Sequence, residues 1–333
     1  MSKRRLYKGM IIFMIVIVPF SFSYASTGIN TSSRAPYSVY LKLINEVKLP
    51  GNPIDIYINE DRAYLLCPSI VVINLTDPNN IPKPEIYSNF TNNANSIAFN
   101  GSYAYIGQDN GVIKIIDFKD NDNPLNKGSI DAFGPISKVF VYNGYLYFIR
   151  KDFGLNVYDI TVPEVPISKG TQVVVGEANS LFVRNHYAYV TSLNANLTII
   201  DVSNISKLPI VGTYNAGINF YDIYVNENYA YVPQGSTGVQ VINISDLPTP
   251  VQITNIFSRK FAKQVVVNGY YTWVNDENSV QAFYSREPKD QLWAGSYDIN
   301  GGTINKLAVE DNKYVYLCSS DMKLKILQVY YNY

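Results

Sequence analysis

A repeat of about 42 residues constrains the fold of this chain more than any other feature. Each copy carries an aromatic triplet such as Tyr229-Ala230-Tyr231, and its second aromatic serves as a marker. The marker recurs at spacings of 41, 42, 42, 42, 42 and 43 residues, at Tyr64, Tyr105, Tyr147, Tyr189, Tyr231, Trp273 and Tyr316. A fixed period of this length is typical of stacked units that cannot bury their apolar faces alone. Seven units fill nearly all of the 333 residues, so we expect one closed array.

Each unit predicts four antiparallel strands. We expect the first strands at Ile54 to Ile58, Ser96 to Phe99, Ser137 to Tyr142, Ser180 to Arg184, Tyr221 to Val225, Gln264 to Val267 and Lys306 to Val309. A turn follows, and its residues tolerate the positive φ that a two-strand hairpin needs: Asn59, Asn100, Asn143, Asn185, Asn226, Asn268 and Asp311.

The second and third strands are apolar on both faces, as in Leu197-Thr198-Ile199-Ile200-Asp201. An antiparallel sheet with two buried faces must lie between neighbouring sheets. The fourth strand, for example Ile210 to Tyr214, begins beside a proline, which suits an outer edge. The sequence therefore predicts an all-β fold, a seven-bladed β-propeller of four-stranded antiparallel blades.

The two ends of the repeat array predict how the ring closes. The chain ends soon after the third strand of unit seven, whereas Leu43 to Leu49 precedes the first strand of unit one without a partner. We expect this N-terminal strand to be the outermost strand of the last blade, which removes an open sheet edge.

The repeated sequence resembles the LVIVD repeat of exported bacterial and archaeal proteins. The resemblance rests on Leu197 to Asp201 and on Gly154-Leu155-Asn156-Val157-Tyr158-Asp159, each preceded by an aromatic triplet, and it covers about residues 40 to 330. Units two to five are close to the motif, whereas unit six lacks it and unit seven keeps only Leu324-Lys325-Ile326-Leu327. The resemblance implies a propeller in the cell envelope or outside the cell, and no particular activity.

The N-terminus predicts export. Residues 1–25 have a basic segment, the apolar run Met10 to Phe22, and the small-x-small pattern Ser23-Tyr24-Ala25, which together indicate a cleavable signal peptide. The alternative is an uncleaved anchor, although the apolar run is shorter than the ~20 residues that span a bilayer. We expect a flexible lead-in at 26–39, the propeller at 40–333, and a protein that is secreted, periplasmic or at the cell surface, with no membrane span after cleavage.

Charge argues against nucleic-acid binding. Four of the 27 basic residues lie in the predicted leader, which leaves 23 basic residues against 27 acidic ones in the mature chain. A nucleic-acid-binding protein would show a concentrated basic face. We expect a monomer that binds a protein or a glycan at the cell envelope.

Repeated acids do not predict a catalytic or metal site. Asp117, Asp159 and Asp201 share one register, but Asn74 and Asn243 replace them in other units. A hydrogen-bonding turn accepts either residue, whereas an acid catalyst does not. His186 is the only histidine and has no evident metal or nucleophile partner. We therefore expect no catalytic residues, no metal and no cofactor, and we interpret the triplet aromatics as packing between blades.

The two cysteines predict a cross-link. Cys67 and Cys318 follow the triplets of units one and seven, which ring closure makes neighbours. An exported protein could join them in a disulfide that ties the first blade to the last, unless both are simply buried thiols.

Loops that depart from the repeat predict a binding surface. The loops between second and third strands share one rim with those that lead from a fourth strand into the next first strand. On that rim, charged and aromatic residues lie where packing does not require them: Arg150, Lys151, Phe153, Glu177, Arg259 and Lys260. Arginine and exposed phenylalanine are typical of interface anchors, although solvated loop tips also carry charge.

Two functional hypotheses follow from these patterns. The first is an exported scaffold that binds a protein or surface glycan through this rim, without catalysis. The second is a propeller hydrolase or lyase with an ion at the central funnel. Both use loop ends near the axis, and the lack of histidines and of a unique acid cluster favours the first.

Overall fold

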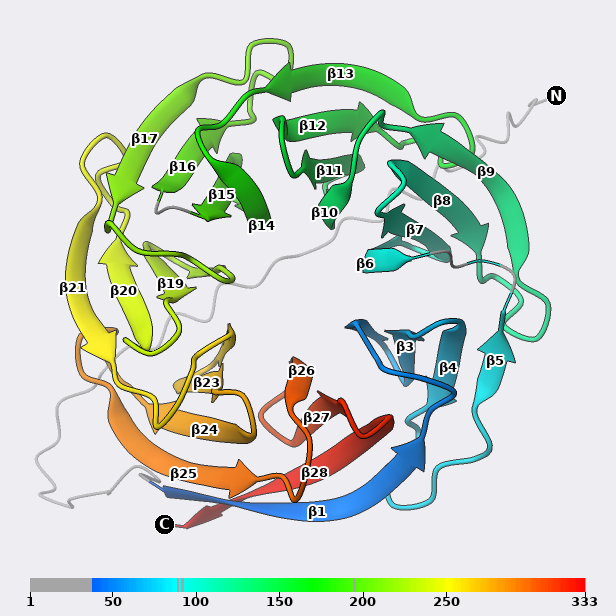
Figure 1. The fold of residues 1–333 in the computed structure, drawn as a ribbon, viewed down its shortest axis with the longest axis vertical. Coiled ribbons are helices and arrows are strands. Elements are labelled where there is room, and N and C mark those ends of the chain that lie inside the picture. The colour runs from blue at the N-terminus through cyan, green and yellow to red at the C-terminus, as the bar shows by residue number, and fades with distance from the viewer. Residues whose placement is uncertain (1–37, 89, 91–92, 194–195, 333) are drawn as a thin grey trace, which may run out of the picture. The chain divides into compact units, whose positions relative to one another are not determined.

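A computed structural model of the protein describes residues 38–88, 90, 93–193 and 196–332. These residues form seven four-stranded antiparallel sheets arranged around a central axis, a seven-bladed β-propeller (Figure 1). The predicted fold class is confirmed. The predicted signal peptide, and the lead-in up to residue 37, lie outside the described residues.

The blades follow one another along the chain, and each is built from the axis outwards in strand order. Blades 1 to 3 are β2 (Asp55–Asn59), β3 (Arg62–Leu66), β4 (Ile70–Asn74), β5 (Glu85–Tyr87); β6 (Ala94–Asn100), β7 (Tyr103–Gln108), β8 (Val112–Asp117), β9 (Leu125–Asp131); and β10 (Ile136–Tyr142), β11 (Tyr145–Arg150), β12 (Gly154–Asp159), β13 (Ile167–Gln172). Blades 4 to 6 are β14 (Glu177–Arg184), β15 (Tyr187–Leu193), β16 (Asn196–Asp201), β17 (Ile210–Asn215); β18 (Tyr224–Asn226), β19 (Tyr229–Pro233), β20 (Val239–Asn243), β21 (Val251–Ile256); and β22 (Gln264–Asn268), β23 (Tyr271–Asn275), β24 (Ser279–Tyr284), β25 (Leu292–Asp298). Blade 7 consists of β26 (Ile304–Glu310), β27 (Tyr314–Ser319), β28 (Lys323–Asn332) and the N-terminal β1 (Ser38–Lys48).

The apolar core lies between the blades rather than within any one of them. In the cluster between blades 1 and 2, Leu66 and Val72 of the first blade pack against Ile97 and Ile106 of the second. Equivalent clusters occupy the other seams. The second and third strands are therefore buried on both faces, as the sequence predicts.

The triplet aromatics provide large buried groups at these seams. All seven marker residues are buried: Tyr64, Tyr105, Tyr147, Tyr189, Tyr231, Trp273 and Tyr316. The Tyr64 hydroxyl donates to Asn121 Oδ1 at 2.9 Å, the Tyr316 hydroxyl to Glu310 Oε2 at 2.6 Å, and Trp273 Nε1 to Asn312 Oδ1 at 3.1 Å. All seven residues pack between blades, which confirms the packing interpretation, and these hydrogen bonds satisfy the polar atoms of Tyr64, Trp273 and Tyr316.

The ring closes through the predicted N-terminal strand. β1 pairs with β28 in register from Ser38↔Asn332 to Lys48↔Lys323. The strand begins at Ser38, two residues before the predicted start of the propeller at residue 40, because Val39 is buried in a cluster with residues of blade 6. Charge reinforces the pairing, since Glu46 of β1 accepts 2.8 Å bonds from both Lys323 and Lys325 of β28.

The hairpin turns differ in detail from the expectation. Asn143, Asn185 and Asp311 have positive φ as expected, but in blades 1 and 5 the positive φ falls one residue later, at Glu60 and Glu227. The turns of blades 3, 4 and 7 have two successive left-handed residues, whereas those of blades 1, 2, 5 and 6 have one, at the residue that follows the asparagine. The first strand of blade 5 is also shorter than predicted, beginning at Tyr224 rather than Tyr221.

Within the described residues, no helix is long and apolar enough to cross a membrane.

We predict that removing residues 1–50 prevents stable folding, although β1 is the one propeller strand lost. Blade 7 would keep an open edge on β28 and would uncover the apolar faces that β1 now covers. A matched protein lacking residues 1–37 retains β1 and should unfold at the same temperature as the full chain. Thermal unfolding followed by circular dichroism measures both, and an unchanged midpoint for the shorter protein would contradict the closure argument.

Candidate functional site

A ring of seven polar residues surrounds the mouth of the central channel. Each lies at the same register near the start of a first strand, one per blade: Asp55, Ser96, Lys138, Ser180, Asp222, Gln264 and Lys306. We call this set the inner ring. No local sequence motif marks this ring, because its members differ in chemistry and share only their spacing of 41 or 42 residues.

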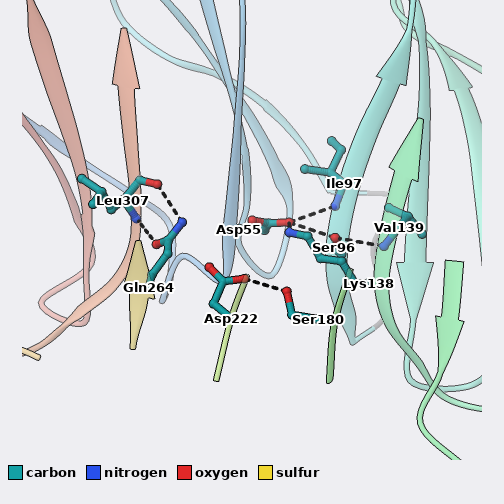
Figure 2. Close-up of polar contacts among 9 residues, drawn as sticks. All are labelled: Asp55, Ser96, Ile97, Lys138, Val139, Ser180, Asp222, Gln264 and Leu307. Atoms are coloured by element: carbon teal, nitrogen blue, oxygen red, sulfur yellow. Dashed lines mark hydrogen bonds and ion pairs between the residues drawn. The ribbon is translucent and has the colours of Figure 1, made fainter. Parts of the chain in front are cut away.

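The inner ring joins neighbouring blades by hydrogen bonds (Figure 2). Asp55 Oδ2 accepts from the backbone of Ile97 at 3.2 Å and from Ser96 Oγ at 3.1 Å. Ser96 Oγ in turn accepts from the backbone of Val139 in blade 3 at 3.3 Å. A side chain of one blade thus satisfies a backbone N–H of the next, although the side chains differ.

The same pattern continues round the ring. Gln264 uses both ends of its amide on Leu307 of blade 7, accepting from the backbone N–H at 2.7 Å and donating to the carbonyl at 2.9 Å. Ser180 donates to Asp222 Oδ1 of blade 5 at 2.6 Å. Figure 2 shows these contacts as separate groups: Gln264 with Leu307, Ser180 with Asp222, and Asp55 with its neighbours of blades 2 and 3.

A second set of polar side chains lies one residue before the inner ring, where first strands carry a β-bulge. The register shifts around Asn95, Ser137, Asn179 and Asn305, which leaves each of them unpaired in its own sheet. Each donates instead to a carbonyl of the next blade, at Ile136, Ala178, Phe220 and Pro53, with distances of 3.0, 3.1, 2.5 and 2.9 Å. The bulge therefore positions a further contact between blades.

Four members of the inner ring carry charge. Lys138 Nζ lies 3.3 Å from Asp55 Oδ2. Burial raises the pKa of Asp55, but Lys138, Lys306 and the hydrogen bonds from Ile97 and Ser96 outweigh burial, so its pKa lies below the usual value. Burial by itself lowers the pKa of Lys306. The negative charges of Asp222 and Asp55 raise this pKa by more than burial lowers it, so it lies above the usual value. Asp55 and Lys306 are therefore both ionised at neutral pH.

Half-buried aromatic side chains line the channel two residues below the inner ring. The rings of Phe140, Phe182 and Tyr224 of blades 3 to 5 contact one another in succession at tilted angles, with centroids 5.2 and 5.0 Å apart. Phe140 also lines a pocket of about 220 Å³, together with Asp55, Lys138 and Tyr57. The channel is thus charged at its mouth and aromatic beneath it.

The predicted rim residues of blades 3 and 4 come together in one cluster. The Arg150 guanidinium lies over the Phe153 ring at 4.2 Å, and Lys151 forms an ion pair with Glu177 of the next blade. The backbone N–H of Ala178 donates to the Lys151 carbonyl at 3.1 Å, which shows that the two loop types share a rim as expected.

The predicted residues of blade 6 form a second, separate cluster. Arg259 lies 3.5 Å from Asp298 Oδ2 and 5.8 Å from the centre of the Trp293 ring. The Lys260 carbonyl accepts from Ser258 Oγ at 2.8 Å. No ion pair or ring contact within the described parts of the chain joins Arg259 or Lys260 to the Arg150 cluster.

The most exposed apolar residues on this rim were missed by the sequence analysis. Phe133 is 83% exposed, Phe257 77% and Val175 72%, each in a loop that leads into a first strand. Phe133 also has φ of 57°, a left-handed conformation that is an outlier for a bulky residue. Its place in Phe133-Gly134-Pro135 was the available signal, since an aromatic residue in a turn has no core to enter.

Phe133 and the Arg150 cluster are neighbours. A side chain at Gly134 would contact Arg150 Nε at 3.4 Å, so the guanidinium lies between this glycine and Phe153. Arg150 Nε is buried and, within the described chain, has no hydrogen-bond partner. We call Phe133, Arg150, Lys151, Phe153 and Glu177 the rim cluster.

The repeated acids form turns, as predicted. The carboxylates or amides of all five residues at this register accept from the backbone N–H two residues later, at 2.8 to 3.0 Å: Asn74, Asp117, Asp159, Asp201 and Asn243. Among the described residues, no group of three or more histidine, cysteine, aspartate or glutamate side chains is placed to bind a metal.

The two cysteines lie together, as free thiols. Cys67 and Cys318 are buried in the same apolar cluster, where blade 1 meets blade 7. Burial raises the pKa of the Cys67 thiol to about 12, and burial with the neighbouring Cys67 raises the pKa of Cys318. Their predicted neighbourhood is present, whereas the disulfide stays a prediction for the oxidised protein.

Comparison with known proteins agrees with this architecture. The LVIVD repeat family matches residues 92–132, 175–216 and 219–256, which correspond to blades 2, 4 and 5. The chain carries LVIVD repeats. The predicted resemblance is confirmed over these blades.

Solved structures share the fold at low sequence identity. The Cps50 (Swd1) β-propeller domain of Myceliophteria thermophila is 11% identical with a TM-score of 0.69, covering 87% of this chain and 99% of that one. The computationally designed Ika8 protein is 10% identical with a TM-score of 0.62, covering 84% of this chain and 98% of the other. At these identities the likeness concerns the fold alone. None of the curated proteins matches the chain.

We predict that substitution of Asp55 by asparagine destabilises the fold at neutral pH and not in acid. The variant leaves Lys138 without its carboxylate partner, so we expect the free energy of unfolding to fall by about 1–3 kcal/mol. Because the pKa of Asp55 is lowered on folding, its contribution is present above the usual value of 3.8 and is lost as the pH falls through the folded value. Urea unfolding at neutral and at acid pH measures the difference. Asp77→Asn, at an exposed turn, should match the wild type at both pH values.

We predict that neither thiol reacts with an alkylating reagent while the protein is folded. With a pKa of about 12, Cys67 is almost wholly protonated at neutral pH, and the thiolate is the reactive form. Mass spectrometry after treatment with iodoacetamide should show no addition to folded protein and two additions after unfolding. Two additions only after reduction would instead establish the disulfide, and rapid reaction of the folded protein would contradict the burial of both thiols.

Proposed function

We propose that the protein is an exported interaction scaffold, and that it binds a protein partner on the rim that carries the rim cluster. The exposed, strained Phe133 beside Arg150 and Phe153 is the observation that carries this proposal. Folding gains little from an aromatic ring in water on a left-handed backbone, whereas an interface uses such a ring as an anchor.

The chemistry of the rim favours a protein over a glycan. Phe133, Phe257 and Val175 supply apolar area without hydroxyl or amide groups for a sugar. Arg150 adds a planar cation already ordered on an aromatic ring. Aromatic residues and arginine are enriched in protein interfaces, and anchors of this kind dominate their affinity.

Exposed apolar residues elsewhere have a different origin. The first residues of five outer strands are all exposed at one register: Leu125, Ile167, Ile210, Val251 and Leu292. A feature present in five blades belongs to the repeat, whereas the rim cluster occurs in one place.

The opposite rim is less suited to a partner. A hollow of about 480 Å³ on that rim, between blades 1 and 2, is lined mainly by polar turn residues. Asn74 in that hollow already accepts from Thr76 at its backbone and its side chain. Turn residues with satisfied side chains offer fewer groups to a ligand than the rim cluster does.

The second candidate function, a hydrolase or lyase with an ion in the funnel, has weaker support. An ion would need converging acids or histidines, whereas the two acids of the inner ring, Asp55 and Asp222, belong to different blades and Asp55 is already paired with Lys138. The proposal of export rests on the N-terminal pattern of residues 1–25 in the sequence.

We predict that Phe133→Gly abolishes capture of a partner without loss of stability. Glycine relieves the left-handed strain, which costs other residues about 1–2 kcal/mol, so the thermal midpoint should stay or rise while the anchor is lost. Capture from an envelope fraction by immobilised wild-type protein and by the variant, compared by mass spectrometry, measures the loss.

Two further variants locate the surface. Simultaneous alanine substitution of Arg150, Phe153, Arg259 and Lys260 should also abolish capture. A matched variant of the opposite rim, Tyr270→Ala with Val165→Ala, removes two exposed apolar residues and should capture the partner normally. If the rim variants still capture the partner and the matched variant does not, the interface lies on the opposite rim and the proposal is wrong.

A further inference from the structure

Arg150 of the rim cluster is held in place by its neighbours. Its guanidinium lies over the Phe153 ring, with 4.2 Å between the Cζ atom and the ring centre. It also lies next to Gly134, where an added β-carbon would be 3.4 Å from Nε and 3.9 Å from Cζ of Arg150. A planar group that is already ordered loses little further freedom when it forms a new contact.

The charge of Arg150 is unpaired. Within the described chain its side chain forms no hydrogen bond and no ion pair, and its Nε is a buried atom without a partner. Acids of the same loops have other partners, since Glu177 pairs with Lys151 and Asp131 accepts from the backbone N–H of Phe133 at 3.0 Å. Donors of an ionised group are costly to leave unpaired near apolar surface, so the site favours an acceptor from outside.

The shape of the guanidinium selects a carboxylate as that acceptor. Its N–H groups form a planar fork that matches the two oxygens of a carboxylate. Arg259, on the same rim, has such a partner within the chain in Asp298, at 3.5 Å. Arg150 has none among the described residues, so a carboxylate of the bound partner would take that place.

The backbone around Arg150 favours a carboxylate on a side chain over one at a C-terminus. A C-terminal carboxylate is captured by several free backbone N–H groups that form a nest. Here the N–H groups of Phe133, Lys151 and Phe153 already donate to other groups of these loops, at 3.0 to 3.1 Å. The guanidinium is then the donor that remains, which suits the side chain of an aspartate or a glutamate.

Exposed apolar side chains accompany this charge on the rim. Phe133, Phe153 and Val175 are all exposed, on loops of blades 3 and 4. An apolar surface that a partner covers excludes water and strengthens an ion pair beside it. The neighbours of the partner's acidic residue should therefore be apolar.

We propose that the rim cluster binds a segment of the partner protein in which an aspartate or a glutamate lies between apolar residues. The carboxylate is held by Arg150, and the apolar residues cover Phe133 and Phe153. Lys151 and Glu177, already paired with each other, leave Arg150 as the charge that selects the partner. This inference rests on the proposed function, since it names the chemistry that the partner brings to the rim.

Short peptides test this chemistry without the unidentified partner. The probe is acetyl-leucyl-glutamyl-leucinamide, compared with its glutaminyl analogue and with acetyl-leucyl-leucine, which carries its carboxylate at the C-terminus. Titration of the isotopically labelled mature chain, followed by NMR, should show the glutamyl peptide shifting the Arg150 Nε–H signal at about 1–10 mM. The other two peptides should each bind about tenfold more weakly.

The same titration contains the results that would overturn the proposal. They are equal binding of the glutaminyl peptide, equal or tighter binding of the peptide with a C-terminal carboxylate, and no shift with the glutamyl peptide at about 10 mM. The comparison uses the unchanged protein, so it does not depend on the folding of any variant.

Arg150→Lys then tests the fork, because lysine keeps the charge and loses the planar group. It should weaken binding of the glutamyl peptide about tenfold, measured on the backbone N–H signal of Phe153. Arg62→Lys changes a half-buried arginine of the opposite rim in the same way, and this matched control should bind the peptide as the wild type does. Unchanged binding by Arg150→Lys would contradict the role of the guanidinium.

This test and that of the proposed function fail in different ways. If the wild-type protein captures no partner from the envelope fraction, the proposed function is wrong, whichever peptide binds. If the wild type captures a partner and Arg150→Lys captures it equally well, the partner docks without the acidic contact, and this inference alone is wrong.

Discussion

The pairing of β1 with β28 is the contact on which the remainder of the propeller depends. Each blade is buried on both faces only because a neighbour covers each of them, so the core exists as seams rather than as one centre. A ring of such seams is stable when every seam is closed. The chain closes the last one by pairing its two ends edge to edge, and Glu46 joins Lys323 and Lys325 across that pair.

The inner ring holds the blades together at their narrowest separation. Side chains as different as Asp55, Ser96 and Gln264 perform one task there, accepting from a backbone N–H of the following blade. Because that task needs an acceptor and no particular charge, the ring can vary in chemistry without loss of the fold.

On the surface, departures from the repeat distinguish residues that are part of the blade's construction from residues that are available for binding. A feature that recurs in several blades, such as the exposed apolar first residue of five outer strands, reflects how the unit is built. Phe133 recurs in none, lies on a left-handed backbone and directly precedes Gly134, which lies next to the Arg150 guanidinium. Strain retained at an exposed aromatic residue indicates selection for something other than stability.

The sequence by itself determined the blade count, the order of strands and the closing strand, because a period of about 42 residues and an alternating apolar pattern allow few other arrangements. It also identified the turn role of Asp117 and its equivalents, since asparagine replaces aspartate at that register. Only the tertiary structure decided the sites. The inner ring is assembled from residues some 42 positions apart that differ in type, so no local motif marks it. Phe133 and Phe257 could not be told from core aromatics by composition, because exposure depends on where the chain turns and on what the neighbouring blade covers.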